Sequence, residues 1–388
     1  MTPAASQAIG AELAFTPELS DEERRLRAWV QSICRRLIGP QLTSWERTGR
    51  VDAAGVRALA ESGLFSLLRR LPDGACQGWA ALALALDEVA RESASVAWLV
   101  LAQNLLRAFL PTELCDGVET GAVVVTLADH EDQSVGPPVG AGLGARVTAG
   151  ERGMRLTGTK RNVLFASIAT HLVVTAGSEA PGGGRFLVRA GERGCLVSPI
   201  VPGGLRSAGF GDVALSSAPA IPVCPWTATS AAFSSVWRAL GTLIEIANGL
   251  AAVAFMVQDA RRKRSFGKPL LKWQAIQFKL TDGYLKLSMV RMMAHYFAWV
   301  LDQRLHVTGS GLDVDCYAAL LRTMYCKLGQ EVQEYCVELG SGRAYRVGHP
   351  AWRRYMDFVT LLLLAGGDDP DRELLSRTLL RPASTASV

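Results

Sequence analysis

The cysteines of this 388-residue chain lack the spacing that metal and redox sites require. All eight stand singly, with no Cys-x-x-Cys pair and no accompanying group of histidines. Cys316, Cys326 and Cys336 recur every ten residues within a stretch of helical pattern. That placement favours small buried apolar side chains over metal ligands. The sequence therefore predicts no metal site and a reduced, cytoplasmic protein.

Long apolar runs, a leader segment and concentrated charge are also scarce. The longest apolar runs, at residues 81–86 and 361–364, are too short to predict a membrane-spanning helix. Residues 1–15 lack a basic stretch followed by an apolar one, so no signal peptide is expected. The net charge is +5, and the basic run at residues 261–264 is narrower than a nucleic-acid-binding surface. We therefore expect neither membrane nor nucleic acid among the partners.

Composition divides the chain into three segments. Residues 1–120 carry apolar side chains at helical spacing, and residues 226–388 return to that pattern after an interruption. Residues 121–225 are rich in Gly, Pro, Val and Thr, with short apolar runs between turn signals, which predicts strands. The layout predicts an α+β protein with an N-terminal helical domain, a small middle β domain (a barrel or sandwich) and a C-terminal helical bundle.

The expected elements follow from these patterns. Helical patterns cover residues 21–37, 53–64, 80–91, 95–110, 230–264, 272–303, 313–339 and 373–380. Strand patterns cover residues 122–127, 154–157, 171–175, 185–188 and 194–197.

More specific motifs stand at the ends of the expected C-terminal helices. RSFGKPL at residues 264–270 is followed by QAIQF at residues 274–278, and the region 339–377 contains Ala365-Gly366-Gly367 before a final arginine-rich turn. GTK at residues 158–160 and WERTG at residues 45–49 add matches in the other two segments. Over nearly its whole length the chain resembles the acyl-CoA dehydrogenase superfamily.

The resemblance implies a flavoprotein that oxidises an acyl thioester, carried by CoA or by acyl-carrier protein, at the Cα–Cβ bond. It implies FAD between a small β-barrel domain and a C-terminal four-helix bundle, with the adenine end reaching a neighbouring subunit. It also implies a dimer or tetramer, and electron-transfer flavoprotein as a partner. A carboxylate close to the α proton removes it, and burial in an apolar pocket lifts the pKa of that base.

The chain departs from the family at both positions where the base is found. In a gap-free register the usual glutamate falls on Ala365, which cannot accept a proton. The less common position, on the first helix of the bundle, falls on Trp237, and its accompanying arginine is retained as Arg238. Glu245 lies two helical turns further on, about 12 Å along the helix axis from the base position. The catalytic base of this chain is therefore unknown, and Glu245 is one candidate for it.

Two further carboxylates follow the vacant position. Asp368 and Asp369 stand in the acidic loop after Ala365 and are candidates for a displaced base. Because Asp strongly favours helix N-caps, we prefer a capping role for them.

The resemblance also implies a set of cofactor-binding positions. They fall on Thr126, Lys263, Arg264, Phe266, Gln274, Glu338 and Gly342. Glu338 replaces a glutamine, and a carboxylate facing a pyrophosphate is repelled unless Lys263 or Arg264 neutralises it. Thr126 alone survives from the β-domain signature, and a single threonine in a strand is more often structural. One half of the flavin site therefore looks weakened.

Three functions stay open. The first is a divergent dehydrogenase of acyl thioesters, or a related flavin enzyme such as a flavin-dependent oxygenase, that works without the usual glutamate. The second is a non-catalytic subunit of a hetero-oligomeric acyl-CoA dehydrogenase that completes the flavin site of its partner. The third is a flavin-free module that binds acyl carriers. We prefer the enzyme because most chains of this fold are flavoenzymes, which is an inference by analogy.

Overall fold

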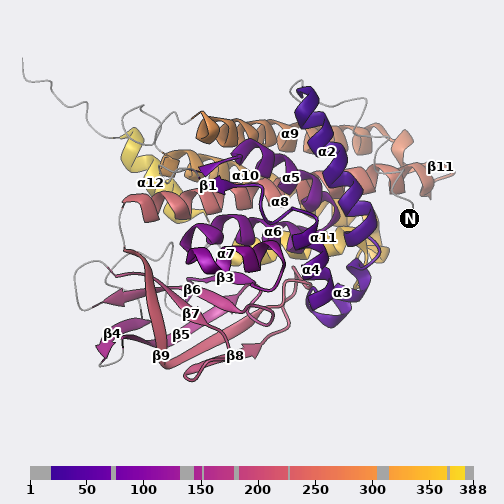
Figure 1. Ribbon diagram of the computed structural model, residues 1–388. Coiled ribbons are helices and arrows are strands. Elements are labelled where there is room, and N and C mark those ends of the chain that lie inside the picture. The colour runs from indigo at the N-terminus through magenta and orange to yellow at the C-terminus, as the bar shows by residue number, and fades with distance from the viewer. Residues whose placement is uncertain are drawn as a thin grey trace, which may run out of the picture.

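The computed structural model describes residues 19–70, 76–131, 144–150, 153–178, 183–225, 228–303, 314–364 and 368–380. Helices come first along the chain, strands follow, and helices return (Figure 1). The strands gather below the helices in this view, and the first and last groups of helices pack together above them. The predicted α+β fold class is confirmed, while the exact domain boundaries stay predictions.

The N-terminal helices match most of the expected patterns. They are α2 (Asp21–Ile33), the π-helical turn η1 (Cys34–Ile38), α3 (Leu42–Thr48), α4 (Ala53–Glu61), α5 (Trp79–Glu92), α6 (Ala94–Leu106), the 3-10 turn η2 (Arg107–Phe109) and α7 (Thr112–Glu119), with a two-residue hairpin of β1 (Arg69–Arg70) and β2 (Cys76–Gln77) before α5. Ser20 and Glu23 form a capping box that starts α2, since each backbone N–H bonds the other's side chain at 2.7 and 3.2 Å. Every residue of α6 is buried, so this helix forms the centre of the N-terminal layer.

The middle segment closes into a barrel. Its strands are β3 (Val125–Ala128), β4 (Arg146–Gly150), β5 (Gly153–Val163), β6 (His171–Ser178), β7 (Gly184–Arg189), β8 (Cys195–Pro199) and β9 (Gly211–Pro225). β6 pairs with β4 and with β7, and β5 and β9 complete the ring, which confirms the small β-barrel. The sequence patterns missed β4 and β9. Pro219, Pro222 and two serines in β9 read as turn signals, but the strand absorbs them with a bulge-like positive φ of 52° at Ser217.

The C-terminal helices surround one long buried helix. They are α8 (Ala228–Arg262), the 3-10 turn η4 (Leu270–Lys272), α9 (Gln274–Asp302), α10 (Val314–Gly340), the 3-10 turn η5 (Ser341–Arg343), α11 (Pro350–Leu364) and α12 (Asp369–Leu379), with the hairpin β10 (Arg264–Ser265) and β11 (Lys268–Pro269) after α8. α8 contacts α5 and α6 as well as α9, α10 and α11. The sequence patterns missed α11.

α8 is apolar along most of its length. Residues Phe233–Arg262 are long and apolar enough to cross a membrane by length and composition, which inspection of uninterrupted runs did not reveal. However, 78% of the apolar window is buried inside the protein, as in the core helix of a bundle.

Asp302 is one of the side chains that join the first and last groups of helices. Asp302, at the end of α9, accepts hydrogen bonds from the backbone N–H groups of Gly78, Trp79 and Ala80 at 2.8, 3.0 and 2.8 Å. The first N–H groups of a helix have no partners within that helix, so an external acceptor stabilises its start. The beginning of α5 is therefore capped by a residue from the C-terminal bundle.

Candidate active site

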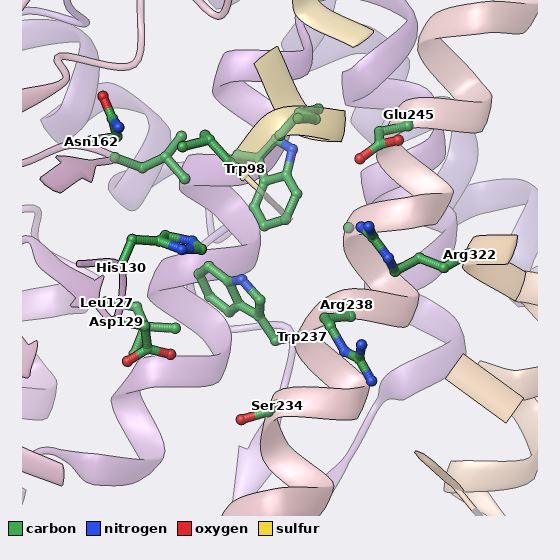
Figure 2. A pocket seen from close by; sticks show the side chains of 14 residues that line it. Trp98, Leu127, Asp129, His130, Asn162, Ser234, Trp237, Arg238, Glu245 and Arg322 are labelled. Atoms are coloured by element: carbon green, nitrogen blue, oxygen red, sulfur yellow. The ribbon is translucent and has the colours of Figure 1, made fainter. Parts of the chain in front are cut away.

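A cavity of about 110 Å³ lies where α6, α8 and the end of β3 meet. Trp98 reaches it from α6, Asp129 and His130 follow β3, and Trp237 and Glu245 lie on α8 (Figure 2). Figure 2 shows the two indoles between the β-domain side chains and the carboxyl of Glu245. The cavity walls are mostly apolar, which suits an acyl chain.

Glu245 is a carboxyl group held in an apolar wall. The residue is 5% exposed, and no described side chain donates a hydrogen bond to its carboxyl. Burial raises the pKa of Glu245 to about 8, and the positive charge of Arg322 opposes this shift only in part. The backbone carbonyl of Glu245 accepts a bond from the Tyr325 hydroxyl at 2.7 Å, which fixes this turn of α8 against α10. Of the proposed base candidates, Glu245 is the one that lines the cavity.

The charges beside Glu245 are balanced by a carboxylate that sequence reasoning missed. Asp371, on α12 and 2% exposed, accepts from Arg238 Nη1 at 2.5 Å and from Arg322 Nε at 2.7 Å. Arg238 and Arg322 also line the cavity. Arg238 therefore binds α12 to α8, and Arg322 binds α12 to α10. An aspartate in a polar segment gives no local sign of burial, and its partners lie 133 and 49 residues away.

Two tryptophans narrow the cavity. The ring centroids of Trp98 and Trp237 are 5.3 Å apart, with the rings tilted by 54°. Gly241 allows this placement, because a Cβ there would lie 2.4 Å from Cη2 of Trp98. The indole of Trp237 thus occupies a wall at the position where the resemblance allows a base.

The two candidate aspartates of the acidic loop do not line the cavity. Asp368 accepts a bond from Arg372 Nε at 2.7 Å, Asp369 is exposed, and neither lines the cavity. Asp368 holds the N-cap position of α12 but makes no capping hydrogen bond through its side chain. Ala365 lies outside the described residues, as do the two glycines after it, while the preceding Leu364 lines the cavity.

The β-domain wall carries polar residues that are mostly engaged. The Thr126 hydroxyl is buried and donates to the backbone carbonyl of Leu164, which is a structural use of that side chain. Asp129 accepts from the Thr175 hydroxyl. Burial lowers the pKa of His130, so the imidazole is neutral near pH 7. Sequence reasoning treated Asp129 and His130 only as departures from a motif, although their position directly after a strand end is a frequent place for site residues.

The other expected cofactor residues form an outer cluster beyond the far end of α8. We use this name for Phe266, Gln274, Glu338 and Gly342, which are all exposed, Phe266 at 92%.

Neighbouring contacts join the two parts of the outer cluster. Lys263 links them, since its ammonium donates to the Leu339 carbonyl and the Ser341 hydroxyl, both at 2.9 Å. Lys263 thereby serves the carbonyl end of α10, and Arg264 donates to the Gly267 carbonyl at 2.7 Å.

The two groups of residues fit a flavin shared between chains. Arg262 is seventeen positions beyond Glu245 on α8, so the cavity and the outer cluster lie about 25 Å apart along the helix. In the outer cluster a Cβ on Gly342 would meet nothing within 4 Å, and Phe266 offers an open ring, which suits a nucleotide. The cavity, by contrast, is below the about 300 Å³ at which ligand pockets usually begin. Its mostly apolar lining and small volume suit an acyl chain.

Comparisons with known proteins all indicate the same family. Two family models match, the acyl-CoA dehydrogenase N-terminal domain at residues 20–111 and the acyl-CoA dehydrogenase C-terminal domain at residues 231–380. Together they cover more than half of the chain.

Individual relatives extend the match. The chain is 27% identical to acyl-CoA dehydrogenase FadE27 of Mycobacterium tuberculosis over 72% of its own length and 74% of that protein. It is 23% identical to the short-chain specific acyl-CoA dehydrogenase of Bos taurus, over 94% and 91% of the two chains. A glutaryl-CoA dehydrogenase from Mycobacterium smegmatis, solved in complex with FADH2, shares the fold with a TM-score of 0.78 at 16% identity, over 95% and 96% of the two chains.

Proposed function

Since the chain belongs to the acyl-CoA dehydrogenase superfamily, we propose that it is a flavin-dependent oxidoreductase of acyl thioesters in which Glu245 removes the α proton. The observation that carries this proposal is the placement of Glu245: a buried carboxyl in the wall of an apolar cavity, without a hydrogen-bond donor among the described side chains. Relatives named as acyl-CoA dehydrogenases support an acyl-CoA substrate. Acyl-carrier protein remains the alternative carrier, and electron-transfer flavoprotein the proposed electron acceptor.

The surroundings of Glu245 suit a general base. A base works best when its pKa lies near the working pH, and burial raises the pKa of Glu245 to about 8. Asp371 neutralises part of the charge of Arg238 and Arg322, so these guanidinium groups do not fully depress that pKa. The rings of Trp98 and Trp237 form an apolar wall beside it. In the proposed reaction the proton passes from Cα of the acyl group to a carboxylate oxygen of Glu245.

The cofactor is proposed to bind between two chains. Phe266, Gln274 and Gly342 of a neighbouring chain would hold its adenosine end, because they are exposed and lie far from the cavity of their own chain. Flavin, when bound, supplies an acceptor for the hydride that leaves Cβ.

Hydrogen–deuterium exchange tests the role of Glu245 without any electron acceptor. The protein is incubated with butyryl-CoA in D₂O, and loss of the α-proton signal is followed by NMR. We expect the wild type to catalyse exchange, and Glu245→Gln to slow it by about 10²- to 10⁴-fold, the range of general-base contributions. Asp368→Asn is the matched control and should keep the wild-type rate.

The opposite outcome would assign the catalytic base to a different residue. Exchange that survives in Glu245→Gln and is lost in Asp368→Asn would place it in the acidic loop. Unchanged thermal unfolding of both variants shows that the comparison concerns chemistry.

A second function is favoured by the outer cluster. Its exposure, about 25 Å along α8 from the cavity, is also what a non-catalytic subunit needs to complete the flavin site of a partner. Colour separates the two proposals. Yellow protein with flavin absorbance, obtained when the chain is expressed alone, favours the enzyme. Colourless protein that becomes yellow only with a co-purified related subunit favours the second role.

Association with another chain is supported by the outer face of α9. Its exposed large side chains recur at spacings of three, four or seven residues and are Phe278, Leu285, Met289, Met292, Tyr296 and Trp299. Such a spacing places them on one side of the helix, and Figure 1 shows α9 at the outer edge of the bundle. We propose that this apolar stripe contacts a second copy of the chain, or a related subunit, in a dimer or tetramer.

A further inference from the structure

The wall of the cavity contains a hydrogen-bond donor without an acceptor. Trp98 is 5% exposed, and its indole Nε1–H is buried and bonds to no described residue. Buried polar groups in folded proteins are almost always hydrogen-bonded, so one that is not calls for a physical reason. A ligand that brings an acceptor into the cavity would provide that reason.

The indole is held firmly in this position. α6, which carries it, is buried along its whole length. Gly241 on α8 lies against the six-membered ring of Trp98, where a Cβ would come within 2.4 Å, and Trp237 packs against the indole with 5.3 Å between ring centroids. A donor that cannot turn away is already oriented when a ligand arrives, so no free energy is spent on ordering it.

The donor also lies near the proposed base. Trp98 and Glu245 line the same cavity, and Figure 2 shows the indole nitrogen on the ring edge that is turned toward the carboxyl of Glu245. The neighbouring guanidinium groups of Arg238 and Arg322 bind Asp371 through Nη1 and Nε respectively, while Nε of Arg238 has no acceptor among the described residues. Trp98 is therefore a neutral donor on the side of Glu245 that has no acceptor among the described residues.

We infer that the Nε1–H of Trp98 donates a hydrogen bond to the carbonyl oxygen of the thioester as Glu245 takes the α proton, an inference that rests on the function proposed above. The Cα–H bond breaks and an O–H bond forms on Glu245. The electron pair of the broken bond moves into the enolate, whose oxygen carries the negative charge. Trp98 stabilises that oxygen. Return of a solvent-derived deuteron from Glu245 to Cα completes exchange, so this half-reaction needs no oxidant.

The experiment uses the same exchange of butyryl-CoA in D₂O with the full chain. Trp98→Phe keeps an aromatic ring in the wall and removes the donor, and we expect it to slow exchange by about 100-fold, as loss of one preorganised oxyanion donor does. Trp352→Phe is the matched control. Trp352, on α11, packs against Tyr345 and Tyr355 and does not line the cavity. It should exchange at the wild-type rate.

A binding measurement separates a donor from a merely structural indole. Wild-type protein should bind butyryl-CoA more tightly than S-butyl-CoA, the thioether that lacks the carbonyl, by roughly two- to tenfold, the worth of one neutral hydrogen bond. Trp98→Phe should bind both alike. This comparison can be read on the wild type alone, even if the variant does not fold.

The outcomes are distinct. Exchange that Glu245→Gln abolishes and Trp98→Phe leaves unchanged overturns the role of Trp98 and keeps the proposed function. Equal binding of thioester and thioether by the wild type also overturns the role of Trp98. Exchange unaffected by Glu245→Gln overturns the proposed function itself.

Discussion

The charged side chains at the two ends of α8 differ in burial and in their partners. At the cavity, Asp371 is buried between two arginines, and the carboxyl of Glu245 lies in a mostly apolar wall where burial raises its pKa. At the outer cluster, Glu338 and Phe266 face solvent, and Lys263 bonds backbone carbonyls. The buried end is complete within this chain, whereas the exposed end is shaped for contact with something outside it. In the proposed function, the proton is therefore bound within one chain and the cofactor between two chains.

The largest effect on stability should come from removing the carboxylate that the two buried ion pairs share. Asp371→Asn leaves Arg238 and Arg322 without their carboxylate, and removing one partner of a buried ion pair costs about 3–5 kcal/mol of the free energy of unfolding. Urea unfolding followed by circular dichroism measures this loss. Asp369→Asn, two residues earlier and exposed, is the control and should change stability little. Equal stability of the two variants would mean that the two ends of α8 do not differ in this way.

The next effect tests whether the exposed side meets another chain. Met289→Glu places a charge in the apolar stripe of α9, and exclusion of one large apolar side chain from an interface corresponds to about 1.5–3 kcal/mol. We expect the association constant, measured by analytical ultracentrifugation, to fall by about 10- to 100-fold. Met154→Glu makes the same change on β5 of the barrel and should leave association unchanged. A stripe that tolerates the glutamate is not the interface.

A smaller effect on stability is expected when a change of pH alters the ionisation of Glu245 at the buried end. The pKa of Glu245 is raised from its ordinary value of 4.5 to about 8, so between these pH values the folded chain holds a proton that the unfolded chain releases. Stability should therefore fall as pH rises from about 4.5 to about 8. In Glu245→Gln this contribution is absent, so the melting temperature should fall less over that range. Parallel melting curves for the two proteins would show that Glu245 is ionised when folded.

The smallest effect belongs to the exposed end. Glu338→Gln removes a carboxylate from the surface proposed to face a pyrophosphate, and we expect flavin affinity to rise by less than about fivefold, as is usual for exposed charges. Quenching of flavin fluorescence measures the affinity. Glu334→Gln, one helical turn earlier and also exposed, is the control. A fall in affinity for Glu338→Gln would mean that Glu338 accepts a bond from the cofactor instead of repelling it.

The sequence alone predicted those parts of the fold that are governed by local periodicity. α8 and α9 were expected within a few residues of their bounds, because a long stretch without proline and with helical spacing has few alternatives. β9 was missed because its prolines usually interrupt strands, and only its pairing with β5, β7 and β8 shows why they are tolerated here.

The site was less accessible to prediction than the fold. Glu245 was among the candidates because it lies two helical turns beyond the position that the family resemblance gives to the less common base. Asp371 and Trp98 gave no such sign. The burial of Asp371 depends on partners from α8 and α10, and the missing acceptor of Trp98 is a property of its surroundings. Long-range contacts of this kind are not contained in the spacing of residues along the chain.

The cap on α5 has a consequence for the order of events during synthesis. Asp302 is 222 residues beyond Ala80, whose N–H it accepts. At translation rates of 5–20 residues per second, about 10–45 s pass between the appearance of α5 and the appearance of its cap. During that interval the start of α5 lacks its native acceptor, and the apolar helix α6 behind it awaits its cover from α8. A nascent chain of this protein is therefore expected to expose apolar surface of α6 until α8 has left the ribosome.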